Sequence, residues 1–208
     1  MNASIYPGKR AATRELILDH AYALARREGL EGLSIGALAQ DVGMSKSGVF
    51  AHFGSREELQ LAVLQAGQQR FLEQVKFPAL SQPRGLARLR AIIGAWIGWI
   101  RAYPSGCVLL AAASEYDGRE GPLHDKVAQQ QAGWRRELVR TIGHAVENGE
   151  LRQGAEPTRI AFEIHALMLG LHHDAALFGF DEAQGHAWAA FERLLASYRP
   201  QGGQGGAP

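Results

Sequence analysis

Residues 34–53 of the chain read SIGALAQDVGMSKSGVFAHF, and the spacing within this stretch decides the fold of the N-terminal part. Gly43 follows Ala39 by four residues, where a short helix has to end with a positive φ that glycine reaches without steric cost. Ser45 can cap the helix that follows, and Val49 supplies that helix with an apolar contact. These intervals predict a helix-turn-helix, a motif whose second helix enters the major groove of DNA.

Further helices are expected on both sides of this motif. Apolar residues recur at three- and four-residue spacing over 13–28, and Gly29 ends that helix. Ser55 caps a long helix with two glutamates in its first turn, which Pro78 ends. The later part of the chain shows the same spacing over 83–103, 107–116, 123–148, 157–178 and 181–198. No stretch keeps the period-two alternation of a strand, so we expect an all-α fold of about nine helices.

Glycine and proline residues between the helical stretches divide the chain into two domains. We expect a three-helix DNA-binding domain over residues 11–71, joined by a long helix to a helical ligand-binding and dimerisation domain over 78–200. The helix that starts at Pro157 carries two adjacent apolar stripes, more than one core contact requires. We therefore expect it to face both its own domain and a partner subunit. Residues 201–208, which consist of small and polar residues, are predicted to be a disordered tail.

Composition favours a soluble globular protein, with 46% apolar and 21% charged residues. The net charge of +1 conceals a local excess, because residues 1–14 and 42–56 carry basic side chains and no acid. Cys107 is the one cysteine, which excludes an internal disulfide and fits a reducing cytoplasm. The first residues lack the apolar core of a leader, and the most apolar run, 92–100, is too short to span a membrane. We expect a cytoplasmic protein with no membrane contact.

With these residues in place, the chain resembles the TetR family of bacterial transcriptional regulators. The resemblance is close over residues 13–59 and includes the Phe50–Phe53 segment and the SREEL opening of the next helix. Beyond that point the architecture matches, and the YPSGC segment that ends at Cys107 is similar to that of one regulator subgroup. The resemblance implies a homodimer that binds a palindromic operator in double-stranded DNA. It also implies a repressor that is released by a small, largely apolar effector, with the last two helices forming the dimer interface.

The candidate DNA contacts lie in the motif and directly after it. Lys46 lies in the first turn of the second helix, where it can donate to guanine O6 and N7 or to a phosphate. The family positions that bind phosphate fall on Ser34, His52 and Arg56. The family commonly has a phosphate-binding tyrosine where this chain has Phe50, so that contact is not expected. For the serines helix capping alone is the alternative, and for His52 packing. The candidates together are Ser34, Ser45, Lys46, Ser47, Gly48, Phe50, His52 and Arg56.

The C-terminal part offers candidates for an effector pocket and for a dimer interface. Aromatic side chains with a few polar anchors are typical of apolar pockets, although ordinary core packing is the alternative for each of them. The pocket candidates are Trp96, Trp99, Tyr103, Cys107, Trp134, His165, Met168 and His172. The interface candidates are Ile164, Leu167, Leu171, Trp188, Phe191 and Leu195.

Two other classes of function are alternatives to a ligand-responsive regulator. An all-helical enzyme or carrier with a purely structural N-terminal motif finds little support, because the sequence has no phosphate loop and no Ser-His-Asp order. We expect no catalytic residue, no cofactor and no metal, since His165 and His172 lie seven residues apart on one helix and such sites need three or four ligands. A regulator controlled by a partner protein, without a small ligand, remains open.

Overall fold

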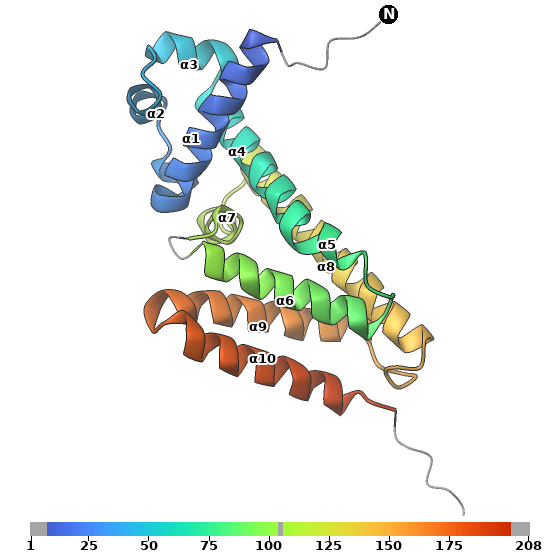
Figure 1. The fold of residues 1–208 in the computed structure, drawn as a ribbon. Coiled ribbons are helices and arrows are strands. Elements are labelled where there is room, and N and C mark those ends of the chain that lie inside the picture. The colour runs from blue at the N-terminus through green and yellow to red at the C-terminus, as the bar shows by residue number, and fades with distance from the viewer. Residues whose placement is uncertain (1–7, 104–105, 201–208) are drawn as a thin grey trace, which may run out of the picture. The chain divides into compact units, whose positions relative to one another are not determined.

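The computed structural model describes residues 8–103 and 106–200, and these residues form helices without a β-strand (Figure 1). Helix α4, the π-helical segment η1 and α5 follow one another without a break, so the described residues form nine continuous helices. The predicted all-α fold is confirmed, whereas the predicted disorder of 201–208 concerns residues outside the described part. The elements are α1 (Lys9–Gly32), α2 (Ile35–Asp41), α3 (Lys46–Phe53), α4 (Arg56–Phe71), η1 (Leu72–Lys76), α5 (Phe77–Ala79), α6 (Leu86–Ala102), α7 (Val108–Tyr116), α8 (Pro122–Glu147), α9 (Pro157–Leu177) and α10 (Phe180–Ser197).

The predicted helix caps are present. The hydroxyl of Ser34 accepts a hydrogen bond from the amide of Ala37, and that of Ser45 accepts one from Gly48, each at 3.1 Å. Ser55 accepts from the amide of Glu58 at 3.0 Å. These side chains satisfy amide groups that the first turn of a helix leaves without a partner, and they therefore fix where the helices start.

Pro78 does not end the long helix, contrary to the expectation from the sequence. In the π-segment η1 the amide of Phe77 bonds to the carbonyl of Leu72, five residues earlier. The chain thus leaves the α-helical ladder just before the proline. Pro78 then lies in the first turn of α5, where a missing amide hydrogen costs no hydrogen bond within the helix. The helix continues to Ala79.

The contacts of the chain fall into two compact units. Of the described residues, the N-terminal unit comprises 8–70 and 106–130, and the C-terminal unit comprises 71–103 and 131–200. Helix α7 and the first turns of α8 therefore pack with the N-terminal unit, although the sequence expectation assigned them to the C-terminal domain. The helices of the described residues include none that is long and apolar enough to cross a membrane.

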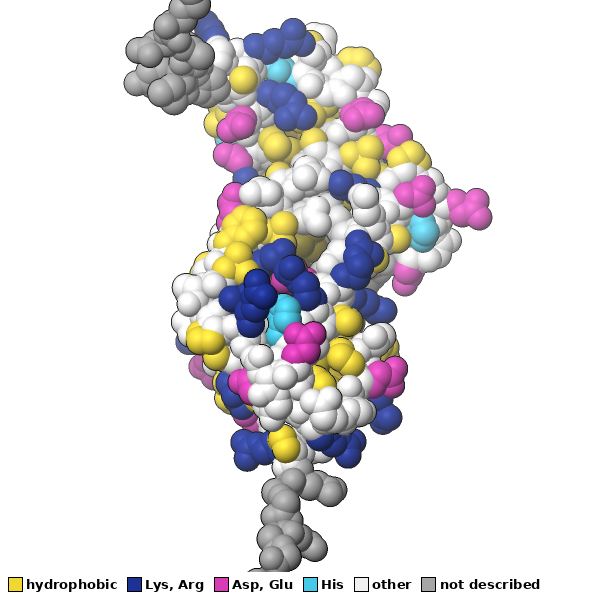
Figure 2. Space-filling model, turned by 90° about the vertical axis from the view of Figure 1, so that its right-hand side faces the viewer, with side chains coloured by type: hydrophobic (Ala, Val, Ile, Leu, Met, Phe, Trp, Pro, Cys, Tyr) yellow, Lys and Arg dark blue, Asp and Glu magenta, His cyan; other side chains and the backbone are white. Residues whose placement is uncertain are grey.

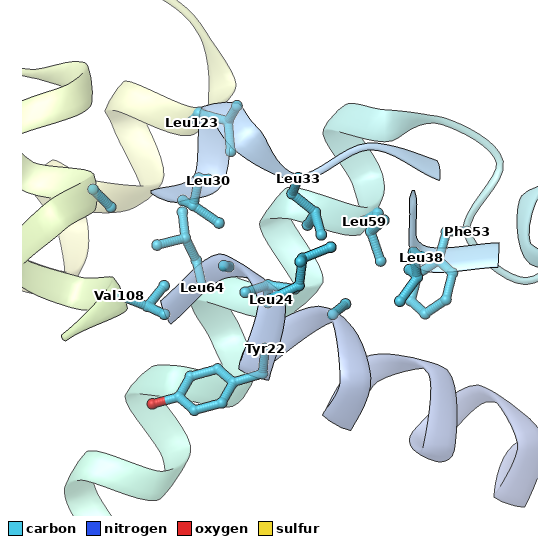
Figure 3. Packing of buried hydrophobic residues seen from close by; sticks show 14 of the residues in the cluster. Tyr22, Leu24, Leu30, Leu33, Leu38, Phe53, Leu59, Leu64, Val108 and Leu123 are labelled. Atoms are coloured by element: carbon cyan, nitrogen blue, oxygen red, sulfur yellow. The ribbon is translucent and has the colours of Figure 1, made fainter. Parts of the chain in front are cut away.

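The N-terminal unit has one core to which six helices contribute. Figure 3 shows side chains from α1, α2, α3, α4, α7 and α8 pointing toward one another, with Leu33, Leu38 and Leu64 fully buried. Val49 of α3 is also fully buried, as its place in the motif predicts. Burial of each large aliphatic side chain stabilises the fold by roughly 1.5–3 kcal/mol. The core therefore fixes α2 and α3 on the scaffold of α1 and α4.

The C-terminal unit is held together by helix packing and by ion pairs between helices. Helices α9 and α10 lie side by side, and α6 packs against α9 and against η1 (Figure 1). The guanidinium of Arg90 on α6 donates to both carboxylate oxygens of Glu192 on α10, at 2.7 and 3.0 Å. Lys76 on η1 forms an ion pair with Glu137 on α8 at 2.9 Å.

Candidate DNA-binding and effector sites

The turn between α2 and α3 has the geometry of a helix-turn-helix. Gly43 has a φ of 64°, in the left-handed region that glycine favours, as the sequence predicts. The amide of Met44 bonds to the carbonyl of Ala39 at 2.9 Å, which closes the turn. Ala39 is 3% exposed and Leu38 is fully buried, so the first helix presents its small face to the core. The second helix starts directly after the turn.

The first turn of α3 faces away from the core. Ser45, Lys46 and Ser47 are exposed, and the two serine hydroxyls lie 3.1 Å apart. One turn later Val49 and Phe53 are buried, so α3 has one face in the core and its N-terminal tip outside. Phe50 lies on the outer face with 52% of its surface exposed. An exposed helix tip with an ammonium group and two hydroxyls can donate to base edges and to phosphates.

Gly48 is constrained by the turn itself. A Cβ atom at this position would lie 3.2 Å from the Ser45 hydroxyl and 3.3 Å from the end of Met44. Both distances are shorter than ordinary contacts, so a side chain here would press on the cap of α3. Gly48, a candidate DNA contact, therefore also has a structural role beside the cap of α3.

The phosphate-binding candidates differ in how the unit holds them. Ser34 is exposed at the start of α2, where its hydroxyl serves as the cap. The Nε of Arg56 donates to the carbonyl of Leu33 at 2.9 Å, and its terminal nitrogen donates to the carbonyl of Glu31. His52 is half-buried, and its Nδ1 is buried without a hydrogen-bond partner. Arg56 therefore ties the α1–α2 junction to the start of α4.

Basic side chains of α1 lie beside α3. A guanidinium nitrogen of Arg10 donates to the carbonyl of Ala51 at 3.3 Å, and the guanidinium of Arg14 stands 4.8 Å over the ring of Phe53. Figure 2 shows Lys and Arg side chains beside a histidine at the end of the N-terminal unit. The positive charge of α1 thus lies beside the C-terminal half of α3, and it adds to an electrostatic footprint for phosphates on the unit that carries the exposed tip.

A cluster of charged residues joins α7 to the end of α1, which the sequence reasoning did not find. The carboxylate of Glu115 accepts from the amides of Leu30 and Glu31, at 3.2 and 3.1 Å. The hydroxyl of Tyr116 donates to Glu31 at 2.5 Å, and Arg119 pairs with Glu31 at 2.9 Å. The hydrogen bond from Tyr116 and the charge of Arg119 lower the pKa of Glu31, while burial raises the pKa of Tyr116.

Gly29 makes this contact possible. It breaks α1 with a φ of 76°, which frees the following amides, and a Cβ there would lie 2.1 Å from a carboxylate oxygen of Glu115. In the sequence, Gly29 alone marks the contact between α1 and α7. Its partner in that contact, Glu115, lies 86 positions further along the chain.

Most of the effector-pocket candidates come together in the C-terminal unit. We define the ring cluster as Phe71, Trp96, Trp99, Tyr103, Trp134 and His165. The ring of Phe71 meets Trp96, Trp99 and Trp134 edge to face, with centroids 5.7, 5.5 and 4.8 Å apart. Trp96 contacts Trp134 at 5.3 Å and His165 at 5.8 Å, and Trp99 contacts Tyr103 at 4.3 Å. Phe71, the ring shared by the three tryptophans, was not among the candidates because it reads as ordinary core in the sequence.

Of the other pocket candidates, Met168 and His172 follow His165 on α9, and Cys107 belongs to the N-terminal unit. Met168 is fully buried and His172 is half-buried, on the same helix as His165. Burial lowers the pKa of His172, and the neighbouring His173 adds to that shift. Cys107 is buried in the N-terminal unit at the start of α7, so the structure does not place it with the ring cluster.

The dimer candidates are mostly buried within the subunit. Ile164 and Phe191 are fully buried, and Leu171 and Leu195 are 3% and 2% exposed. Leu167 is half-buried, and Trp188 is 36% exposed. Trp188 is thus the one candidate among the exposed apolar side chains described in this part of the chain; the others are Phe162, Leu169, Leu177 and Phe178.

Two family models match the sequence. The model described as bacterial regulatory proteins of the tetR family matches residues 17–63, which contain the helix-turn-helix. The model described as a tetracyclin repressor-like C-terminal domain matches residues 85–191, more than half of the chain. None of the curated proteins matches at a significant level.

Solved structures share the fold at low sequence identity. A TetR-family transcriptional regulator from Cytophaga hutchinsonii has a TM-score of 0.81 at 18% identity, over 95% of this chain and all of that one. The TetR-family regulator SCO4454 from Streptomyces coelicolor has a TM-score of 0.79 at 19% identity, over 92% of this chain and 97% of that one. AibR, solved with isovaleryl coenzyme A and operator DNA, has a TM-score of 0.69 at 24% identity, over 86% of this chain and 97% of that one.

Proposed function

The chain belongs to the TetR family of bacterial regulatory proteins, and we propose that it acts as a homodimeric repressor. In this proposal α3 binds a palindromic operator. The C-terminal unit binds a small apolar effector, and this binding releases the DNA. Proteins of this family are DNA-binding transcriptional regulators, and so is this chain. What we propose beyond this is repression, dimerisation and the release of DNA by an effector. The proposed place of action is the cytoplasm, where operator DNA lies.

The exposed tip of α3 is the observation that carries the proposal. Lys46 and Ser47 project from the first turn of a helix whose opposite face is fixed in the core by Val49. This is the part of a recognition helix that meets base edges. We assign Lys46 to a guanine edge and the hydroxyls of Ser45 and Ser47 to a base or a phosphate.

Phosphate contacts are proposed for the residues that border α3. Ser34 and Ser55 cap helix starts, where amide groups and the helix dipole favour an anion. Lys9, Arg10 and Arg14 add positive charge at the start of α1. We assign His52 a phosphate contact. Arg56, which already donates to two carbonyl groups, positions the α1–α2 junction in addition to any phosphate contact.

The proposed dimer uses the outer face of α9 together with Trp188 of α10. Phe162, Leu169 and Leu177 are 60%, 42% and 62% exposed and repeat at helical spacing. Ala166 and His173 are exposed between them, so the stripe continues for four turns. An exposed apolar stripe of this length favours a protein interface. The candidates Ile164, Leu171, Phe191 and Leu195 would support this face from inside the subunit.

The proposed effector site is the ring cluster. AibR, which shares the fold, was solved with isovaleryl coenzyme A and operator DNA, so one regulator of this fold takes both a small molecule and DNA. Aromatic side chains from the end of α4 and from α6, α8 and α9 converge in this cluster. Such a lining is typical of an apolar ligand site.

Selection of binding sequences from random double-stranded DNA tests the proposed function. We expect enrichment of an inverted repeat, because a two-fold dimer reads two half-sites related by symmetry. The control is a variant in which Lys46 and Ser47 are both alanine, which should enrich nothing while keeping its helical circular dichroism. Enrichment of a single asymmetric site, or no enrichment by the unchanged protein, would overturn the proposal.

A further inference from the structure

The ring cluster holds buried nitrogen atoms that have no hydrogen-bond partner. Among the described residues four buried side-chain nitrogens lack one, and three of them are Trp99 Nε1, Trp134 Nε1 and His165 Nδ1. These three side chains are only 2%, 9% and 6% exposed. Native proteins pair nearly all their buried polar groups, so three exceptions in one cluster need an explanation.

The other buried polar side chains of the described residues do have partners. Gln60 donates to the carbonyl of Leu30 at 2.6 Å, and Gln130 donates to that of Leu64 at 3.2 Å. Thr141 donates to the carbonyl of Glu137 at 2.9 Å. The fold therefore satisfies buried polar groups where they serve packing alone. Of the four exceptions among the described residues, three lie in the ring cluster and the fourth is Nδ1 of the half-buried His52.

The three nitrogens are connected through shared aromatic contacts. Trp99 and Trp134 both pack on Phe71, and His165 packs on Trp96, which also contacts Trp134. Phe71 directly precedes the π-segment η1. Segments of this kind are frequent at functional sites.

Two of the cations near the cluster share one carboxylate, and a third, Arg135, is exposed to solvent. Lys76 and Arg140 both bind the carboxylate of Glu137, at 2.9 and 2.6 Å, so neither cation needs an anionic ligand. Burial lowers the pKa of His165, and the positive charge of Arg135 adds to that shift. Both effects favour the uncharged imidazole of His165. The indole nitrogens carry a hydrogen and can only donate.

We propose that the ring cluster binds an uncharged, apolar ring compound that presents carbonyl or ring oxygens as acceptors to the indole groups of Trp99 and Trp134. His165 completes the site through its Nδ1, which can donate to or accept from a third polar atom of the ligand. This assignment rests on the proposed function, because it names the chemical class of the effector. The rings are in contact, so the ligand enters as they part.

The indole N–H signals of the full chain in an ¹H–¹⁵N spectrum test this site directly. The chain has four tryptophans, and Trp188, which lies outside the cluster and is 36% exposed, provides an internal control. The probes are coumarin, 9-fluorenone and flavone, which are flat, uncharged and rich in acceptor oxygens. Naphthalene is the acceptor-free comparison and 2-naphthoate the charged one. We expect the Trp99 and Trp134 signals to move with at least one acceptor probe, and the Trp188 signal to stay in place.

Two matched substitutions separate the hydrogen bond from the loss of ring surface. Trp99→Phe removes an unpartnered donor, and Trp96→Phe removes the same ring area from a tryptophan whose nitrogen is not among the unpartnered atoms. Loss of one neutral hydrogen bond corresponds to about fivefold weaker binding of the acceptor probe. We expect that additional loss for Trp99→Phe over Trp96→Phe, and no such difference for naphthalene.

The outcomes distinguish this inference from the proposed function. If none of the three acceptor probes moves either indole signal, or if 2-naphthoate or naphthalene binds as tightly, the ligand class is wrong even when operator selection succeeds. Indole signals that show only a bound water as partner would also overturn it. If an acceptor probe moves both signals but leaves operator binding unchanged, the site stands and the proposed release of DNA fails.

Discussion

At the scale of single residues, the α3 side chains proposed to read bases differ from those that hold the start of the helix in place. Lys46 and Ser47 point outward and have no structural task in the core, whereas Ser45 and Gly48 build the cap that starts the helix. Substitutions in the first pair should change DNA binding alone. Substitutions in the second pair should change the helix first and DNA binding through it.

Lys46→Ala is expected to weaken operator binding by roughly 1–3 kcal/mol while leaving the midpoint of thermal unfolding unchanged, because an exposed lysine contributes little to the fold. Titration of the selected operator by fluorescence anisotropy measures the loss, with Lys126→Ala as the control. If binding to unrelated DNA falls by the same factor, Lys46 contacts phosphate instead of a base.

At the scale of elements, a carboxylate on α7 binds the end of α1, directly before the helix-turn-helix. Glu115 on α7 accepts two amide hydrogens at the point where Gly29 breaks α1. The same junction carries the carbonyl of Leu33 and the Glu31 side chain, both of which hold Arg56. The arrangement connects α7 with the start of α2 and of α4 through three residues.

Glu115→Ala is expected to destabilise the protein by about 2 kcal/mol, because it leaves two amides without their charged acceptor. Urea unfolding measures the change. Asp117→Ala removes an exposed acid two residues later and should stay within about 0.5 kcal/mol of the unchanged protein. Equal effects of the two substitutions would mean that the Glu115 contact contributes nothing specific.

Local signals in the sequence predicted the elements well, and contacts between distant residues account for what they missed. The caps at Ser34, Ser45 and Ser55 follow from neighbours in the chain, so they could be read directly. The persistence of the helix past Pro78 depends on a π-segment that has no sequence signature. The partner of Gly29 lies on another helix and could not be inferred from spacing.

The candidate sites show the same limit. Two apolar stripes on α9 were visible, one with Ile164 and Leu171 and one with His165 and Met168, and these four residues all proved to be buried within the subunit. The exposed Phe162 and Leu169 belong to neither stripe, so the spacing did not identify the outer face of the helix. The tryptophans were identified as a group, yet Phe71 and the unpartnered nitrogens could emerge only from coordinates.

At the scale of the whole molecule, the exposed stripe on α9 determines the proposed assembly. The double substitution Phe162→Lys with Leu169→Lys is expected to give a monomer by light scattering, because two charges on a stripe of this kind oppose its burial. Operator affinity should fall with it, since one subunit reads only one half-site. Phe77→Lys, at an apolar side chain of 45% exposure outside α9 and α10, is the control. A variant that stays dimeric would refute this interface.

The stability of the molecule should depend on pH through its paired glutamates. Burial raises the pKa of Glu137, but the hydrogen bonds from Arg140 and Lys76 outweigh burial and lower it. The hydrogen bond from Arg90 lowers the pKa of Glu192. A lowered pKa in the folded state gives a contribution that is present above the ordinary carboxyl pKa of about 4.3 and is lost as the pH falls through the lowered value. We expect Glu137→Gln to make this acid loss of unfolding free energy shallower, and the exposed Glu147→Gln to leave it unchanged. Identical curves for both variants would contradict the assignment.

Protection of guanine N7 from methylation on the selected operator tests most directly whether α3 reads the major groove. We expect protected guanines in both half-sites, about 10 base pairs or a multiple of that apart, with protection lost in the complex of Lys46→Ala. A stable complex in which every guanine N7 stays reactive, or in which one half-site alone is protected, would contradict it.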